Sequence, residues 1–161
     1  MSDAARIPEL PRLLEAVEKI RPVIEADAAA SEALRALPPT SVDAIRDAGV
    51  FHMIVPRELG GCEADPRSQS EVIERLAYAD PSAAWCGFIG AGSTAFVAAH
   101  LPQGGLDEVL DRSSGEWPIF AGSPQPTGRA ERVPGGYRVA GRWGYASGIR
   151  HAGAGSSQAS W

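Results

Sequence analysis

GGYRVAGRWGYASGIRHA, at residues 135–152, is the most informative stretch of this sequence. Together with Pro134 it opens on Pro-Gly-Gly, a tight-turn signal of the kind that reverses a β-strand. Apolar residues then share one parity, at Tyr137, Val139, Trp143 and Tyr145. This period of two predicts a strand with one buried face. The small residues that follow, at 146–148, are typical of a place where the backbone approaches a ligand closely.

The residues before this stretch predict helices. Apolar residues recur every three or four positions from about Pro8 to Leu37, which is the period of one helical stripe: Leu13, Leu14, Val17, Ile20, Val23 and Ile24. Pro22 lies inside this pattern, and we expect it to kink the helix or to split it.

Three further helices are expected, each with its own start signal. Thr40 or Ser41 is expected to cap the second helix, which stops at Gly49. The third helix carries Val72 and Leu76, and its expected cap is Ser68 or Ser70. The fourth begins with Asp80 as its cap and Pro81 as its first residue.

The fourth helix extends to about His100 and contains a 17-residue segment without a charge, at 83–99. That length is near the lower limit of about 17 residues for a membrane span. The segment also holds three glycines, Ser93 and Thr94, and few large aliphatic residues. We therefore expect a helix buried on all sides and no membrane span.

After a short helix at about 103–112, the period changes. Two strands are expected at 117–121 and 128–133, with a loop at 122–126 between them. Helices followed by strands indicate an α-domain and then the beginning of a β-domain. We divide the chain into residues 1–115, residues 116–152 and a tail at 153–161.

The net charge and the two cysteines argue against some classes of function. A net charge of −5 argues against a general affinity for nucleic acid. The two cysteines, Cys62 and Cys86, lack the spacing of metal ligands, and the acidic residues are scattered, so no metal site is indicated. A reducing cytoplasmic location is expected.

Three short motifs carry a family resemblance: Gly-Arg-Trp at 141–143, Ala-Ser-Gly at 146–148 and His-Ala at 151–152. In this order they resemble the middle domain of the acyl-CoA dehydrogenase superfamily, and most of all its flavin-dependent aromatic monooxygenase branch. The resemblance runs from about Arg12 to Ala152. It implies a truncated acyl-CoA dehydrogenase-like fold, with a mainly α N-terminal helical bundle followed by the first strands of a β-barrel-like middle domain.

The resemblance also implies an activity. Members of this branch hydroxylate phenol-like aromatic substrates with O₂ and reduced flavin, FMN or FAD, which a separate flavin reductase supplies. The full-length proteins form homo-oligomers. The resemblance further implies that Trp143 and Ser147 hold the flavin, that Ser123 borders the flavin and the substrate, and that His100 accepts the phenol proton.

Taken by themselves, the same residues allow simpler interpretations. Trp143 would be a core aromatic and Ser147 a turn former. His100 would stabilise the C-terminus of its helix. His151 is expected to be structural.

Two other functions stay open from the sequence. An acyl-CoA dehydrogenase would share the fold, but the loop at 121–126 lacks the Thr-Glu-Pro signature that dehydrogenases show there, which favours the hydroxylase. The tail GAGSSQASW at 153–161 contains no aliphatic residue larger than alanine. A truncated, non-catalytic fragment or a partner-binding helical domain is therefore the third possibility.

Overall fold

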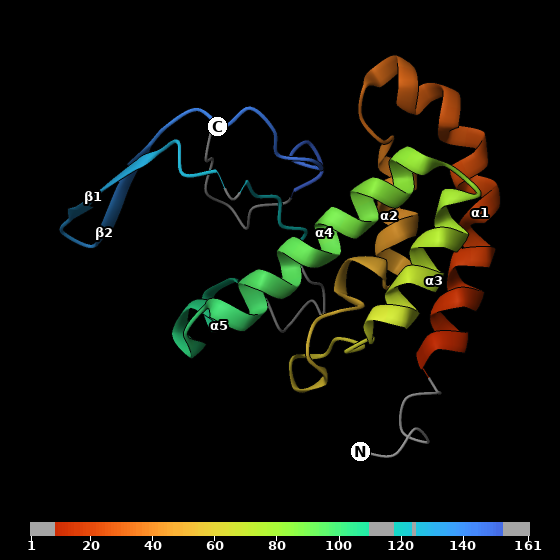
Figure 1. Ribbon diagram of the computed structural model, residues 1–161, viewed down its shortest axis with the longest axis horizontal. Coiled ribbons are helices and arrows are strands. Elements are labelled where there is room, and N and C mark those ends of the chain that lie inside the picture. The colour runs from red at the N-terminus through yellow and green to blue at the C-terminus, as the bar shows by residue number, and fades with distance from the viewer. Residues whose placement is uncertain (1–8, 110–117, 124, 153–161) are drawn as a thin grey trace.

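The computed structural model describes residues 9–109, 118–123 and 125–152. A group of helices forms one part of the molecule, and a two-stranded sheet projects from it (Figure 1). The α-helices are α1 (Glu9–Leu34), α2 (Pro39–Asp47), α3 (Pro66–Ala77), α4 (Pro81–His100) and α5 (Gln103–Val109). Two 3₁₀ turns, η2 (Val50–His52) and η3 (Arg57–Leu59), follow α2, and the strands are β1 (Arg129–Val133) and β2 (Gly136–Ala140). The mainly helical class that the sequence predicts is confirmed.

Helix α1 confirms the first predicted helix, and of the two expected effects of Pro22, a kink or a split, the split does not occur. Pro22 lies inside α1. Leu13, Val17 and Ile24 of the predicted stripe are buried in the core. Because their burial stabilises the helix on both sides of Pro22, the loss of one backbone hydrogen bond at the proline is tolerated.

The start of α2 differs from the expectation. Its N-cap is Pro38, which offers no side-chain cap, and Pro39 starts the helix with a preset backbone angle. The hydroxyls of Thr40 and Ser41 instead donate to Oδ2 of Asp27 on α1, at 2.8 Å from Ser41. These hydrogen bonds lower the pKa of the Asp27 carboxyl and tie α2 to α1.

The expected cap of α3 is also wrong. Asp65 is the N-cap, and its Oδ1 accepts from the backbone N–H groups of Arg67 at 3.0 Å and Ser68 at 3.2 Å. Asp80 caps α4 as predicted and accepts from the N–H of Ala83 at 2.6 Å. Both helices thus begin with an Asp-Pro pair, because the carboxylate satisfies free N–H groups and proline suits the first helical position.

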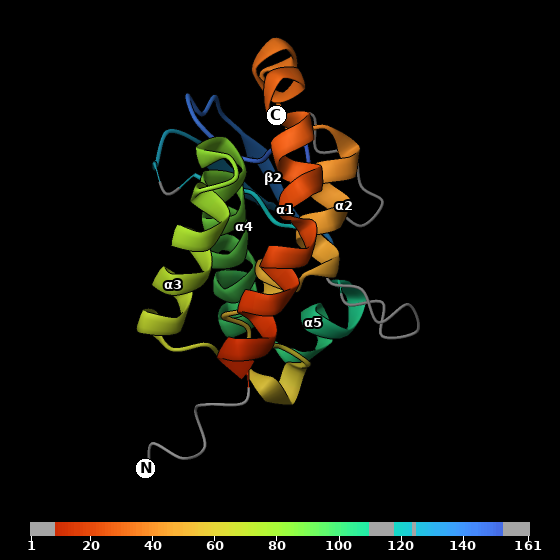
Figure 2. The same ribbon diagram turned by 90° about the vertical axis from the view of Figure 1, so that its right-hand side faces the viewer.

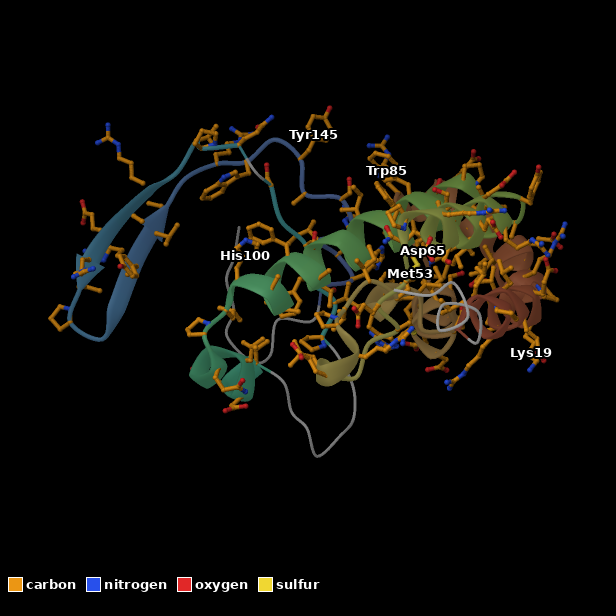
Figure 3. All side chains as sticks on the ribbon, turned by 60° about the horizontal axis from the view of Figure 1, so that its bottom comes forward. Lys19, Met53, Asp65, Trp85, His100 and Tyr145 are labelled. Carbon is orange, nitrogen blue, oxygen red and sulfur yellow. The ribbon has the colours of Figure 1, made fainter. Side chains whose placement is uncertain are left out.

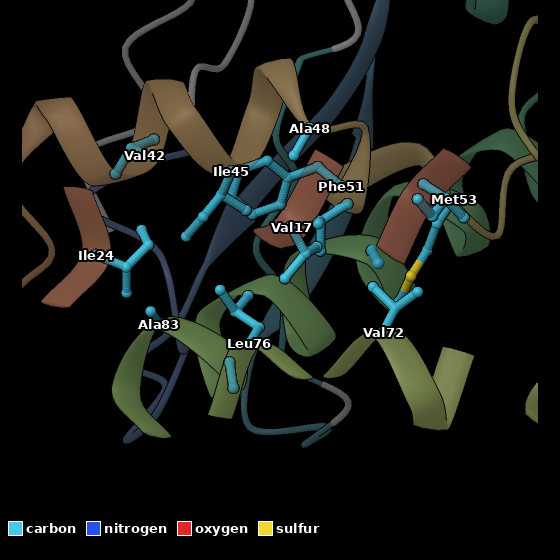
Figure 4. Close-up of a cluster of buried hydrophobic side chains, with 14 of the residues drawn as sticks. Val17, Ile24, Val42, Ile45, Ala48, Phe51, Met53, Val72, Leu76 and Ala83 are labelled. Carbon is cyan, nitrogen blue, oxygen red and sulfur yellow. The ribbon is translucent and has the colours of Figure 1, made fainter. Parts of the chain in front are cut away.

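The core lies where α1, α2, α3 and α4 surround η2 (Figure 4). Figure 2 shows α3 beside both α1 and α4. Two glycines let α4 approach η2 closely. A Cβ added at Gly90 would lie 2.7 Å from Cδ1 of Phe51, and one at Gly87 would lie 3.1 Å from Cγ1 of Val50. No larger residue fits there without displacing a buried side chain.

The other face of α4 corrects a prediction, because this helix is not buried on all sides. Trp85, Phe88 and Phe96 are 55%, 44% and 64% exposed. Among the described residues, α4 is the one helix that is long and apolar enough to cross a membrane by length and composition. Its small-residue face nevertheless packs against α3 and η2 as part of the core.

The predicted hairpin is confirmed, but its buried face is not. β1 and β2 pair antiparallel with Ala130 opposite Val139, and Gly135 turns the chain with φ +86°. Tyr137, Val139 and Tyr145 are 62%, 57% and 84% exposed, and β2 ends at Ala140. Among the described residues, no second layer packs against this two-stranded sheet, so its face is not buried.

The strand predicted at 117–121 is also wrong where the structure describes it. Residues 118–121 form no regular element, although Ile119 is buried in the core. Trp117, residues 110–112 of the predicted fifth helix, the domain boundary at 115 and the tail at 153–161 lie outside the described residues.

A pair of glycine substitutions tests the packing of α4. We expect Gly90→Ala to lower the free energy of unfolding by about 1 to 2 kcal/mol, because overpacking against Phe51 outweighs the gain in helix propensity. Gly92→Ala is the matched control, since a Cβ there meets nothing within 4 Å. It should stabilise by up to about 1 kcal/mol. Urea unfolding measures both, and equal effects would contradict this packing.

Candidate functional site

A groove of about 420 Å³ runs along the exposed side of α4. One wall comes from α4 and the other from the segment at 120–123, and all the lining residues are uncharged: Phe88, Ile89, Gly92, Ser93, Phe96, Val97, Phe120, Ala121, Gly122 and Ser123. Three phenyl rings and few polar side chains suit a flat, mostly apolar ligand.

Ser123 and Trp143 both contact Gln125 in the loop that follows Ser123. Ser123 lines the groove, and its Oγ is 3.5 Å from the N–H of Gln125. The indole N–H of Trp143 donates to the carbonyl of Gln125 at 3.0 Å. The Trp143 ring also packs against the backbone at Gly141, where an added Cβ would lie 2.7 Å from Cη2. Trp143 therefore holds the loop that carries Ser123.

Ser147 lies in a turn that is attached to the helices. Its Oγ accepts a hydrogen bond from the indole N–H of Trp85 on α4 at 3.1 Å. In the same turn, the guanidinium of Arg150 donates to the carbonyl of Leu34 at 3.1 Å. Gly148 adopts φ +79°, a conformation that favours glycine. The sequence-predicted flavin contact is thus held against α4.

His151 makes the third attachment of this turn. Its Nε2 accepts from the backbone N–H of Leu37 at 3.2 Å. Burial, and to a lesser degree the neighbouring charge of Arg150, lower the pKa of His151. Both effects favour the neutral imidazole, which alone can accept this hydrogen bond.

His100 lies apart from Ser147. It is near the opposite end of α4 from Trp85 (Figure 3), about 22 Å away along the axis at a rise of about 1.5 Å per residue. Its ring stacks on Phe96 with centroids 4.1 Å apart, and its Nδ1 is 2.8 Å from the carbonyl of Phe96. Since a carbonyl only accepts, Nδ1 carries a proton, which leaves Nε2 as the ring nitrogen that can bear a lone pair.

The structure therefore separates the four predicted site residues and does not gather them in one cluster. Ser123 lies in the groove, Trp143 behind its loop, Ser147 beside Trp85, and His100 one turn beyond Phe96. The aromatic wall that Phe88 and Phe96 form on α4 was not predicted from the sequence. The signal was present, because Trp85, Phe88, Gly92 and Phe96 are spaced by three or four residues and so form one helical stripe. Within the described ranges, no three metal-ligating side chains are grouped to hold a metal ion.

Comparison with known families adds a second line of evidence. The N-terminal domain of acyl-CoA dehydrogenases matches residues 14–112, which is more than half of the chain. This chain belongs to the acyl-CoA dehydrogenase family. The predicted resemblance is confirmed, and the matched residues include α2, α3, α4 and α5.

The individual relatives include a flavin-dependent monooxygenase. The chain is 39% identical over 107 residues to an indole-3-acetate monooxygenase from Pseudomonas putida, covering 66% of this chain and 26% of that protein. It is 35% identical over 142 residues to HsaA, the oxygenase subunit of a flavin-dependent monooxygenase from Mycobacterium tuberculosis, covering 87% and 35%. The structure of XiaF from Streptomyces in complex with FADH2 and glycerol superposes with a TM-score of 0.83 at 34% identity, covering 92% of this chain and 37% of XiaF. The chain thus spans about a third of the length of these relatives.

Substitution of His151 tests how the turn is attached. Because the folded pKa is lowered, the contribution of His151 to stability is present above its unfolded pKa of about 6.5 and is lost as the pH falls through the folded pKa. We expect His151→Gln, which keeps an acceptor near the position of Nε2 without titrating, to lose less stability than the wild type between about pH 7.5 and pH 5.5. Thermal unfolding across this range measures the difference.

His151→Phe is the comparison variant. It removes both the titration and the acceptor, so it should be less stable than His151→Gln at every pH. Parallel pH profiles for the wild type and His151→Gln would contradict the assignment of the neutral imidazole.

Proposed function

We propose that this chain is the N-terminal part of the oxygenase of a two-component flavin-dependent monooxygenase, which hydroxylates a phenol-like aromatic substrate with reduced flavin and O₂. The observation that carries the proposal is the aromatic-walled groove between α4 and the Ser123 loop. Family membership supports it, and so do relatives that include an indole-3-acetate monooxygenase and a flavin-dependent monooxygenase.

The residues present fit a flavin and a flat substrate. Phe88, Phe96 and Phe120 offer apolar walls to an aromatic ring, and the groove bears no charge that would have to be desolvated. Ser123 supplies a hydroxyl at its edge. Trp143 and Ser147 are the residues that we propose hold the flavin, FMN or FAD, with Ser147 at a turn of small residues.

Bound reduced flavin would supply the electrons that activate O₂ for transfer to the ring. The protein's own contribution is to orient the ring, to exclude water and to move a proton. Nε2 of His100 is the ring nitrogen that can accept the phenol proton, while the Phe96 carbonyl keeps the other proton on Nδ1. Loss of that proton makes the ring a better nucleophile.

The proposal extends to partners and location. A flavin reductase would deliver the reduced cofactor, and the whole protein would act as a homo-oligomer in the cytoplasm. Relatives that are oxygenase subunits or components support a reductase partner. Because the chain spans about a third of such relatives, we assign it contacts to flavin and substrate rather than the complete turnover.

Flavin binding and turnover test this function. The purified chain should quench the fluorescence of FMN or FAD and sediment as a defined oligomer. With a flavin reductase, NADH and O₂, the longer oxygenase that contains this chain should convert at least one phenol in a panel to a product with one added oxygen atom. Absence of flavin binding would contradict the proposed cofactor site. Binding without hydroxylation of any phenol would contradict the proposed reaction.

Two serine variants separate the proposed roles. Ser147→Ala should weaken flavin binding by about 2- to 10-fold, which corresponds to the loss of one hydrogen bond. Ser123→Ala should leave flavin binding closer to the wild type and raise the KM for the phenol by a similar factor. If Ser123→Ala weakened flavin binding and Ser147→Ala raised the KM for the phenol, the two residues would have the opposite roles.

A further inference from the structure

Trp85 is an exposed aromatic residue with a specific hydrogen bond. Although its side chain is 55% exposed, its indole N–H donates to Oγ of Ser147, 62 residues away in the chain, at 3.1 Å. The Trp85 ring also contacts Phe88, with centroids 6.2 Å apart and planes tilted by 46°. Phe88 lines the groove. Trp85 therefore touches both the groove wall and the turn that carries Ser147.

The chemistry of this hydrogen bond constrains Ser147. An indole nitrogen only donates, whereas a hydroxyl has one hydrogen to donate and two lone pairs. Trp85 occupies one of these lone pairs, so the Ser147 hydrogen points away from Trp85 and is left for another acceptor. A hydroxyl that already accepts a hydrogen bond is also a better donor, because the two bonds polarise each other.

We infer that Trp85 is a positioning residue for the flavin site, which orients the Ser147 hydroxyl so that it donates a hydrogen bond to an acceptor atom of the flavin. This inference rests on the proposed function. A carbonyl oxygen or an unprotonated ring nitrogen of the isoalloxazine provides such an acceptor. Trp85 acts through Ser147 and needs no contact with the flavin itself.

A double-mutant cycle tests the inference. Dissociation constants for oxidised FMN and FAD are measured by fluorescence titration for the wild type, Trp85→Phe, Ser147→Ala and the double variant. Trp85→Phe keeps an aromatic ring against Phe88 and removes the N–H. We expect it to weaken binding by about 2- to 10-fold, the loss of one hydrogen bond, and to have no further effect when Ser147 is already alanine.

The outcomes distinguish the inference from simpler explanations. An additive cycle, or an unchanged dissociation constant for Trp85→Phe in a wild type that binds flavin, would overturn the positioning role and leave the proposed function intact. A wild type that binds neither FMN nor FAD would overturn both. Tyr78→Phe is the control, because it removes one polar group from another exposed aromatic residue, 70% exposed at the end of α3, and should bind flavin as the wild type does.

A second measurement examines the contact without flavin. In ¹⁵N-labelled protein, the indole N–H resonance of Trp85 is assigned from its absence in Trp85→Phe. Ser147→Ala should shift this resonance and speed its exchange with water, because the N–H loses its acceptor. An unchanged resonance would overturn the inference whatever the flavin titrations show.

Discussion

The close contact between two glycines of α4 and the 3₁₀ turn η2 determines most of this architecture. Gly87 and Gly90 leave room for Val50 and Phe51, and a Cβ at either position would press on those buried side chains. The small residues of α4 consequently face the core. Its large aromatic residues, Trp85 among them, lie on the opposite face. There they are exposed on the side of the groove and do not fill the core.

That division gives α4 three tasks. Its buried face completes the core, its exposed aromatic stripe lines the groove, and its first turns hold the turn at 146–152 through Trp85. The last task depends on two further hydrogen bonds, from Leu37 to His151 and from Arg150 to Leu34. Because these bonds join segments more than 60 residues apart, the position of Ser147 is a property of the fold and not of its local sequence.

Local signals predicted much of this fold. Helical periodicity located α1, α2, α3 and α4, Asp80-Pro81 marked the start of α4, and Pro-Gly-Gly located the hairpin. The same Asp-Pro signal starts α3, where the prediction of a serine cap was wrong. Thr40 and Ser41 donate hydrogen bonds to Asp27, and no sequence pattern specifies such a long-range partner.

The predicted burial of one face of β2 was wrong. A period of two shows which residues share a face of a strand, whereas burial of that face requires a second layer. The family resemblance implies roles for Ser123, Trp143, Ser147 and His100, but only the structure shows that the four residues lie apart.

In the proposed function, the exposed face of α4 and the turn around Ser147 form one binding surface. Mapping backbone amide shifts during titration with oxidised FMN tests it most directly, because amides near a bound aromatic ring shift strongly. We expect the largest changes along α4 from Trp85 to Val97, at 120–123 and at 146–148, with little change along α1 and α3. Changes concentrated on α1 or α3, or none at saturating FMN, would contradict it.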